Sequence, residues 1–133
     1  MKILVVDDEF VALTKMETLL SDYGECDTAS DGMEALVKFQ QAYLNSEEYD
    51  LITIDIDMPS LNGLQLLKRI TSDEENLYIP KAKKIIVTAE GSPNNVYQAA
   101  ENNCDAFLVK PVKKDTLEMK LKNIGIVKKL SYA

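Results

Sequence analysis

The chain of 133 residues is long enough for one domain with a single hydrophobic core. A net charge of −7 and the lack of a recognisable nucleic-acid-binding motif argue against direct binding of DNA or RNA. No apolar stretch approaches the length that spans a membrane, and only four apolar residues lie between Lys2 and Asp7, which predicts no secretory signal peptide. Together with two cysteines that we expect to stay reduced, these features indicate a cytoplasmic protein.

Short apolar runs alternate with helical patterns along the chain. Runs rich in Val and Ile predict buried parallel strands, and one weaker run predicts an edge strand. The predicted strands are residues 3–6, 25–29 (the weak one), 51–54, 85–87 and 106–109. This alternation is typical of a parallel α/β fold with right-handed crossovers.

Helices are predicted after each strand from the spacing of the apolar residues. The first is expected over residues 10–22, and the third follows Gly63. Asp31 with Glu34 three residues later predicts a capping box for the second helix, and Ser92-Pro93 predicts the N-cap and first residue of the fourth. The residues expected to face the core are Leu13, Met16, Leu19, Leu20, Leu36, Phe39, Leu64, Leu67, Ile70, Leu117, Leu121 and Ile124.

Polar residues follow four of the predicted strands. They are Asp7-Asp8, Asp55, Thr88 and Lys110. The carboxyl ends of the strands in an open parallel sheet line one crevice where ligands bind, so we expect these five residues to converge on one site.

The residue types at this site predict phosphoryl chemistry with a divalent ion. Three neighbouring carboxylates raise one another's pKa unless a cation lies between them, and oxygen ligands suit Mg²⁺ or Mn²⁺. The chain has no His and its two Cys lie apart, which argues against a zinc site. Lys110 and Thr88 suit the charged oxygens of a phosphoryl group, and Asp55 is the best-placed nucleophile for an aspartyl phosphate.

The order and spacing of these motifs resemble the receiver domain of two-component response regulators, over residues 2–124. The matching motifs are Asp7-Asp8, Asp55-Ile56-Asp57-Met58-Pro59, Thr88-Ala89 and Lys110-Pro111. The resemblance implies a doubly wound (βα)5 fold, a flavodoxin-like or CheY-like three-layer sandwich with a five-stranded parallel sheet in the order 2-1-3-4-5. We expect the receiver domain over residues 1–125, a short tail over 126–133 and no effector domain.

The same resemblance implies a role for each site residue. Asp55 would be the phosphoacceptor, and the Mg²⁺ ligands would be Asp8 and Asp55, with Asp7 acting through water. Asp57 would add its backbone carbonyl to these ligands. Thr88 would follow the phosphoryl group on activation, and Lys110, with a cis bond to Pro111, would pair with that group. Phe107 would be the switch aromatic, and Glu90 would tune hydrolysis together with Asp57.

By this resemblance the chain is a bacterial single-domain response regulator rather than an enzyme acting on other molecules, catalysing only its own phosphorylation and dephosphorylation. A histidine kinase, a histidine phosphotransfer protein or a small donor such as acetyl phosphate would supply the phosphoryl group. The surface of the fourth helix, fifth strand and fifth helix would then change and control a partner protein. The oligomeric state would be a monomer or a phosphorylation-dependent dimer.

Three other interpretations remain open from the sequence. Ile54-Asp55-Ile56-Asp57 also fits the nucleophile motif of haloacid-dehalogenase-type phosphatases. Those enzymes carry the motif on the first strand and need acidic metal ligands downstream of the motif lysine, whereas here the Asp pair lies upstream and only 23 residues follow Lys110. A flavodoxin-like nucleotide or flavin binder would need a Gly-rich loop where Asp7-Asp8-Glu9 stand. A receiver that serves only as a phosphorylation-independent scaffold conflicts with the complete set of site residues.

Charge and length mark further features of the chain. Residues 1–57 carry a net charge of −11 and the remainder +4. Six lysines form a basic cluster on and after the last predicted helix. A solvated helix face that complements the helix dipole is the simpler explanation for this basic cluster, and a docking surface for an acidic partner is the alternative. Two segments look longer than a minimal receiver needs, residues 40–49 and 71–84, and both are expected at the amino-terminal edge of the sheet. The basic cluster consists of Lys113, Lys114, Lys120, Lys122, Lys128 and Lys129.

Overall fold

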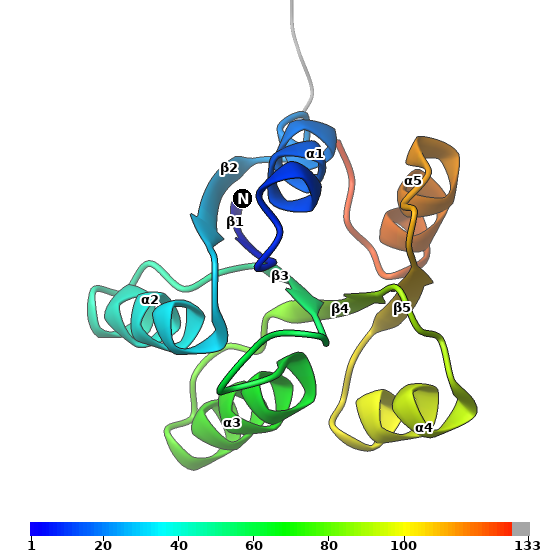
Figure 1. The fold of residues 1–133 in the computed structure, drawn as a ribbon. Helices are drawn as coiled ribbons and strands as arrows, with labels where there is room; N and C mark the ends of the chain where they lie inside the picture. The colour runs from blue at the N-terminus through cyan, green and yellow to red at the C-terminus, as the bar shows by residue number, and fades with distance from the viewer. Residues whose placement is uncertain (129–133) are drawn as a thin grey trace, which may run out of the picture.

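Five parallel strands form one sheet in the computed structural model, which describes residues 1–128 (Figure 1). The strand order is β2-β1-β3-β4-β5, as the family resemblance implies. The three inner strands are almost wholly buried, which explains their continuous apolar runs. The strands are β1 (Lys2–Val6), β2 (Glu25–Ala29), β3 (Leu51–Asp55), β4 (Lys83–Thr88) and β5 (Ala106–Val109).

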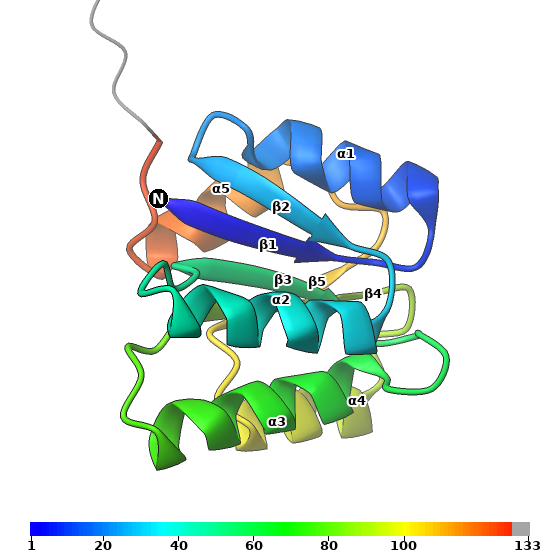
Figure 2. The same ribbon diagram turned by 90° about the vertical axis from the view of Figure 1, so that its left-hand side faces the viewer.

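Five helices cover the two faces of this sheet and make a three-layer sandwich. Helices α1 and α5 lie on one face, and α2, α3 and α4 lie on the other (Figures 1 and 2). Side chains alternate along each strand, so Ile3 and Val5 belong to the core under α1 and α5, whereas Leu4 and Val6 belong to the core on the other face. The helices are α1 (Phe10–Leu20), α2 (Gly32–Leu44), α3 (Gly63–Asn76), α4 (Pro93–Glu101) and α5 (Lys114–Asn123).

Most of the predicted helix features are confirmed, and two are wrong in detail. Ser92 caps α4 by accepting the N–H of Asn95, with Pro93 as first helical residue. Asp31 caps α2, but Glu34 does not complete a capping box, because its carboxylate accepts from the hydroxyl of Ser30 at 3.0 Å instead of the N–H of Asp31. Ile124 is only half-buried and lies just past the end of α5.

The helices also differ in length from the predicted ones. α1 ends at Leu20, two residues before the predicted end. The segments that look long in the sequence are partly helical, since α2 continues to Leu44 and α3 continues to Asn76. Past α5, Ile126 is buried in the core under α1 and α5, whereas residues 129–133, including Lys129, lie outside the described residues.

The two cysteines lie at opposite edges of the sheet. Cys26 belongs to the edge strand β2, Cys104 leads into the edge strand β5, and both thiols are free. Among the described residues, no helix has the length and apolar character needed to cross a membrane.

Strand register brings the carboxyl ends of the inner strands to one edge. Val6 at the end of β1 pairs with Ile54 of β3, and Asp55 pairs with Val87 of β4. Thr88, the last residue of β4, pairs with Val109 of β5. The polar residues that follow these strands therefore meet along a single edge.

Candidate functional site

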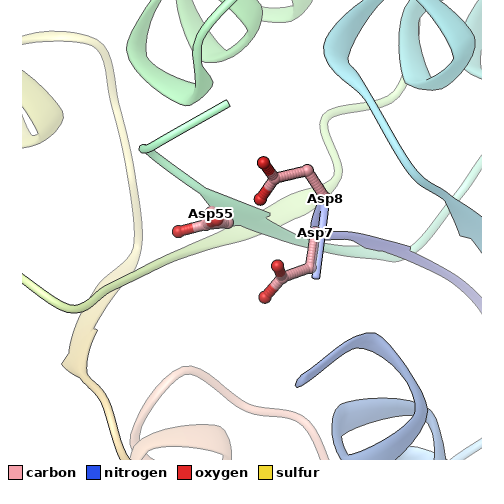
Figure 3. Close-up of side chains that lie close together, drawn as sticks. All are labelled: Asp7, Asp8 and Asp55. Atoms are coloured by element: carbon pink, nitrogen blue, oxygen red, sulfur yellow. The ribbon is translucent and has the colours of Figure 1, made fainter. Parts of the chain in front are cut away.

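Three carboxylates meet at the carboxyl edge of the sheet. Asp7 and Asp8 follow β1, and Asp55 is the last residue of β3. Asp7 and Asp55 are buried, Asp8 is exposed, and each offers an oxygen within 4.8 Å of the others. Figure 3 shows Asp7 and Asp8 extending from the end of β1 toward Asp55. The predicted acidic cluster is therefore present in the fold.

Lys110 reaches into this cluster from the end of β5. Its ammonium nitrogen donates to Oδ2 of Asp7 at 2.8 Å and lies 3.6 Å from Oδ1 of Asp55. Its backbone N–H donates to the carbonyl of Thr88 at 2.7 Å, which fixes the residue beside β4. The peptide bond from Lys110 to Pro111 is cis, as the resemblance implies.

The cluster has an electrostatic cost that falls on Asp55. Burial and the neighbouring charge of Asp7 raise the pKa of the Asp55 carboxyl to about 7, against the opposing effects of Lys110 and of a hydrogen bond from the Asp57 backbone. Burial alone would lower the pKa of Lys110, but its hydrogen bond to Asp7 and the charge of Asp55 outweigh that effect and raise it. The one ammonium of Lys110 thus does not balance the negative charge of the three carboxylates.

Thr88 lies at the end of β4 with its side chain fully buried. Its hydroxyl donates to Oδ2 of Asp57 at 3.3 Å and accepts the N–H of Glu90 at 3.2 Å. Asp57 and Glu90 are themselves exposed, on the loops that follow β3 and β4. The sequence places these three residues near the site but does not predict the hydrogen bonds that join them.

Phe107 lies in β5 as a half-buried side chain packed against the core on the face of α2, α3 and α4. Gly91, in the loop before α4, lies close to the same region. A Cβ built on Gly91 would come 2.7 Å from Cγ2 of Val109 and 3.9 Å from the Phe107 ring. The loop between β4 and α4 therefore lies against β5.

One residue that positions the site, Gly63, has a role that sequence reasoning missed. A Cβ at Gly63 would lie 2.2 Å from the carbonyl oxygen of Asp55, so only glycine lets α3 begin this close to the end of β3. Asn62 and Gln65 form a full capping box at this helix start. The Asn-x-x-Gln spacing is the sequence signal that could have predicted this capping box and helix start.

Comparison with known proteins identifies the family. Residues 3–122 match the response regulator receiver domain. The chain belongs to this family. CheY-like relatives include the chemotaxis protein CheY-3 of Vibrio cholerae, 35% identical over 93% of this chain and 91% of the relative, and the chemotaxis protein CheY of Pseudomonas aeruginosa, 32% identical over 93% and 95%.

Solved structures of receiver proteins share the fold. Vibrio cholerae CheY4 is 30% identical with a TM-score of 0.78, covering 92% of this chain and 97% of that one. The CheY of a CheX-CheY-BeF3-Mg²⁺ complex from Borrelia burgdorferi is 26% identical with a TM-score of 0.81, covering 95% and 90%. The chain is thus a CheY-like receiver of two-component signalling, which argues against the dehalogenase-type and nucleotide-binding interpretations.

Proposed function

We propose that this receiver is a cytoplasmic phosphoacceptor that takes a phosphoryl group on Asp55 in a Mg²⁺-dependent reaction. A histidine kinase or a histidine phosphotransfer protein would donate the group, and the modified receiver would control a separate partner protein. The observation that carries the proposal is the placement of the buried Asp55 beside two further carboxylates, with the Lys110 ammonium 3.6 Å away.

A divalent cation fits the residues present. Receiver domains generally bind Mg²⁺, and the Asp55 carboxyl here has a pKa raised by burial and by Asp7, which a cation between the carboxylates would reverse. Asp8 and Asp55 would bind the ion directly, Asp57 through its backbone carbonyl and Asp7 through water. The bound ion would neutralise charge on the phosphoryl oxygens.

The chain's own groups supply the nucleophile and part of the charge. A carboxylate oxygen of Asp55 forms the bond to phosphorus. The donor's phosphorus–nitrogen bond to imidazole, or phosphorus–oxygen bond to acetate, breaks, and its electron pair leaves with the donor. Lys110 then pairs with the added negative charge. In hydrolysis, water attacks the phosphorus and returns the free carboxylate and inorganic phosphate.

The phosphorylated state would be read out on the surface formed by α4, β5 and α5. Thr88 would move toward the phosphoryl group, and Phe107 would turn inward into the space that Thr88 vacates. Large apolar side chains are exposed on these three elements, which supports a contact surface there. They are Val96, Tyr97, Val109 and Met119. A state change of this kind requires that the partner bind the two surfaces with different affinities.

The basic residues around α5 lie next to this surface, and their contacts indicate whether they form a separate site for an acidic partner. Lys120 and Lys122 lie in the last turn of α5, where they complement the helix dipole. Lys114 and Lys128 both lie within 4.0 Å of Glu118. These contacts favour the simpler explanation for the cluster, a solvated and dipole-complementing face, over a dedicated site for an acidic partner.

Intact-mass spectrometry after incubation with acetyl phosphate and Mg²⁺ tests the proposal. We expect one phosphoryl group on the wild type, none without a divalent ion and none on Asp55→Asn. Asp22→Asn serves as the matched control, because Asp22 is exposed at the far end of α1 and should leave phosphorylation unchanged. The absence of an adduct on the wild type, with no binding of beryllofluoride and Mg²⁺, would favour the phosphorylation-independent scaffold.

A further inference from the structure

The hydroxyl of Thr88 is engaged in both directions. It donates to Oδ2 of Asp57 at 3.3 Å and accepts the N–H of Glu90 at 3.2 Å. The side chain is fully buried, so water cannot replace either partner without a structural change. Any movement of this hydroxyl toward Asp55 therefore breaks a hydrogen bond to a carboxylate.

Asp57 follows the acceptor residue by two positions. Its side chain accepts the hydroxyl of Thr88. One residue thus connects the acceptor to the end of β4. The Asp57 side chain is exposed to solvent, and its Oδ2 accepts the hydrogen bond from the hydroxyl.

The Thr88 hydroxyl is also connected to the start of α4. The amide nitrogen of Glu90 donates to it, and the carbonyl of Glu90 accepts from Nδ2 of Asn95 in the first turn of α4 at 3.2 Å. The backbone N–H of Asn95 in turn donates to Ser92 at the N-cap. Release of Thr88 would therefore loosen the loop that leads into α4.

We propose that the Asp57 carboxylate is a positioning residue that holds the Thr88 hydroxyl in the unphosphorylated arrangement and so opposes activation. The inference rests on the proposed function, in which Thr88 follows the phosphoryl group. Activation exchanges the hydrogen bond between Thr88 and Asp57 for one between Thr88 and a phosphoryl oxygen. The strength of the first bond sets how far the equilibrium lies toward the inactive arrangement.

A double-mutant cycle separates this role from a simple charge effect. Removal of Asp57 also removes a negative charge near an anionic ligand, which would raise affinity whether or not Thr88 is restrained. Affinity for beryllofluoride in saturating Mg²⁺ is therefore measured by calorimetry for four proteins: wild type, Asp57→Ala, Thr88→Val and the double variant. Val keeps the branched shape of Thr and replaces only the hydroxyl, with a methyl group.

The two roles predict different results. With Thr88 present, Asp57→Ala should raise the affinity by about fivefold more than it does in the Thr88→Val background, as expected for loss of one charge-assisted hydrogen bond. An equal effect in both backgrounds, or a lower affinity for Asp57→Ala, would overturn the inference. A wild type that binds no beryllofluoride at all would instead count against the proposed function.

A second measurement needs neither Thr88→Val nor a ligand. Three-bond couplings to the methyl carbon of Thr88 report its side-chain rotamer by NMR in the free protein. We expect one rotamer in the wild type and averaging in Asp57→Ala, together with a shift of the Glu90 amide. Glu90→Gln is the charge control, because the Glu90 side chain makes no hydrogen bond to Thr88. Unchanged couplings in Asp57→Ala, or equal changes in Glu90→Gln, would contradict the restraint.

Discussion

The ammonium nitrogen of Lys110 lies 2.8 Å from Oδ2 of Asp7, although 103 residues separate them in the chain. The strands that these residues follow, β5 and β1, are not neighbours in the sheet, since β3 and β4 lie between them. The ion pair thus joins residues that follow strands on either side of β3 and β4. Asp55, at the end of β3, lies 3.6 Å from the same ammonium.

Removal of the Lys110 charge should slow phosphorylation of Asp55. Lys110→Met leaves the developing phosphoryl charge without its fixed cation, so we expect the rate with acetyl phosphate and Mg²⁺ to fall by about 10- to 100-fold. Lys114→Met is the control, because Lys114 is an exposed residue of α5. The rate is measured by intact mass over time, and equal rates for the two variants would contradict the role of Lys110.

Stability in the absence of divalent ions should depend on the ionisation of Asp55. The pKa of its carboxyl is about 7 in the folded chain, raised by burial and by Asp7 from an ordinary value of 3.8. The native state therefore holds a proton that the unfolded state has lost between these values, and the free energy of unfolding falls as pH rises toward 7. Below pH 3.8 both states are protonated, and this destabilisation is absent.

Asp55→Asn removes the buried negative charge that the Asp55 carboxylate carries once it has lost its proton. We expect the variant to exceed the wild type in free energy of unfolding by about 1–3 kcal/mol at pH 8, with the difference shrinking toward zero as pH approaches 4. Urea denaturation at pH 5 and pH 8 without divalent ions measures it, with Asp22→Asn as control. A difference that is the same at both pH values, or a less stable Asp55→Asn, would refute this account.

Hydrolysis of the phosphorylated receiver should depend on Asp57. Asp57 and Glu90 are exposed acids on the two loops beside the acceptor, where they can repel or misorient an attacking water. We expect a long-lived phosphoryl group in the wild type and a severalfold change in its loss, toward faster hydrolysis, in Asp57→Asn. The phosphorylated mass is followed after removal of acetyl phosphate, and an unchanged rate would argue against this role.

A buried ion pair at the opposite edge of the sheet should contribute strongly to stability. Nζ of Lys84 lies 2.5 Å from Oε1 of Glu74, and the two side chains are 3% and 1% exposed. Glu74 also accepts the N–H of Ala82 at 2.8 Å, and Lys84 donates to the backbone carbonyl of Ala82 at 2.9 Å. The pair thus ties the last turns of α3 to the start of β4.

Removal of one partner leaves a buried charge uncompensated. We expect Lys84→Met to lower the free energy of unfolding by about 3–5 kcal/mol, and the added Glu74→Gln to restore much of it, since Gln still accepts from Ala82. Lys114→Met, in an exposed pair with Glu118, should cost less than about 1 kcal/mol. Urea denaturation gives all three values. A loss for Lys84→Met as small as that for Lys114→Met would contradict the prediction.

The sequence predicts those features that depend on local pattern and parallel topology. The strand runs before Asp7, Asp55 and Lys110 place these residues at one edge, because parallel strands share the direction of their carboxyl ends. Even the weak run at residues 25–29 coincides with β2. The family motifs then order the same residues along the chain as in receivers.

Features that depend on side-chain direction are not visible in the sequence. Residues 71–84 read as a polar connection, yet Glu74 and Lys84 from this segment are among the most buried charged residues described. The capping box predicted for α2 failed because Glu34 reaches Ser30, a choice between two neighbouring donors that spacing cannot decide. The hydrogen bond between Thr88 and Asp57 joins the end of β4 to the loop after β3, so no local pattern records it.

Mapping of the phosphorylated residue shows directly whether Asp55 is the phosphoacceptor. The wild type is phosphorylated with acetyl phosphate and Mg²⁺, reduced with borohydride and mapped by peptide mass spectrometry, since borohydride converts an aspartyl phosphate to homoserine. We expect homoserine at position 55 alone, and none without acetyl phosphate or in the absence of Mg²⁺. Homoserine at another aspartate, or a phosphorylated protein that resists reduction, would contradict Asp55 as the acceptor.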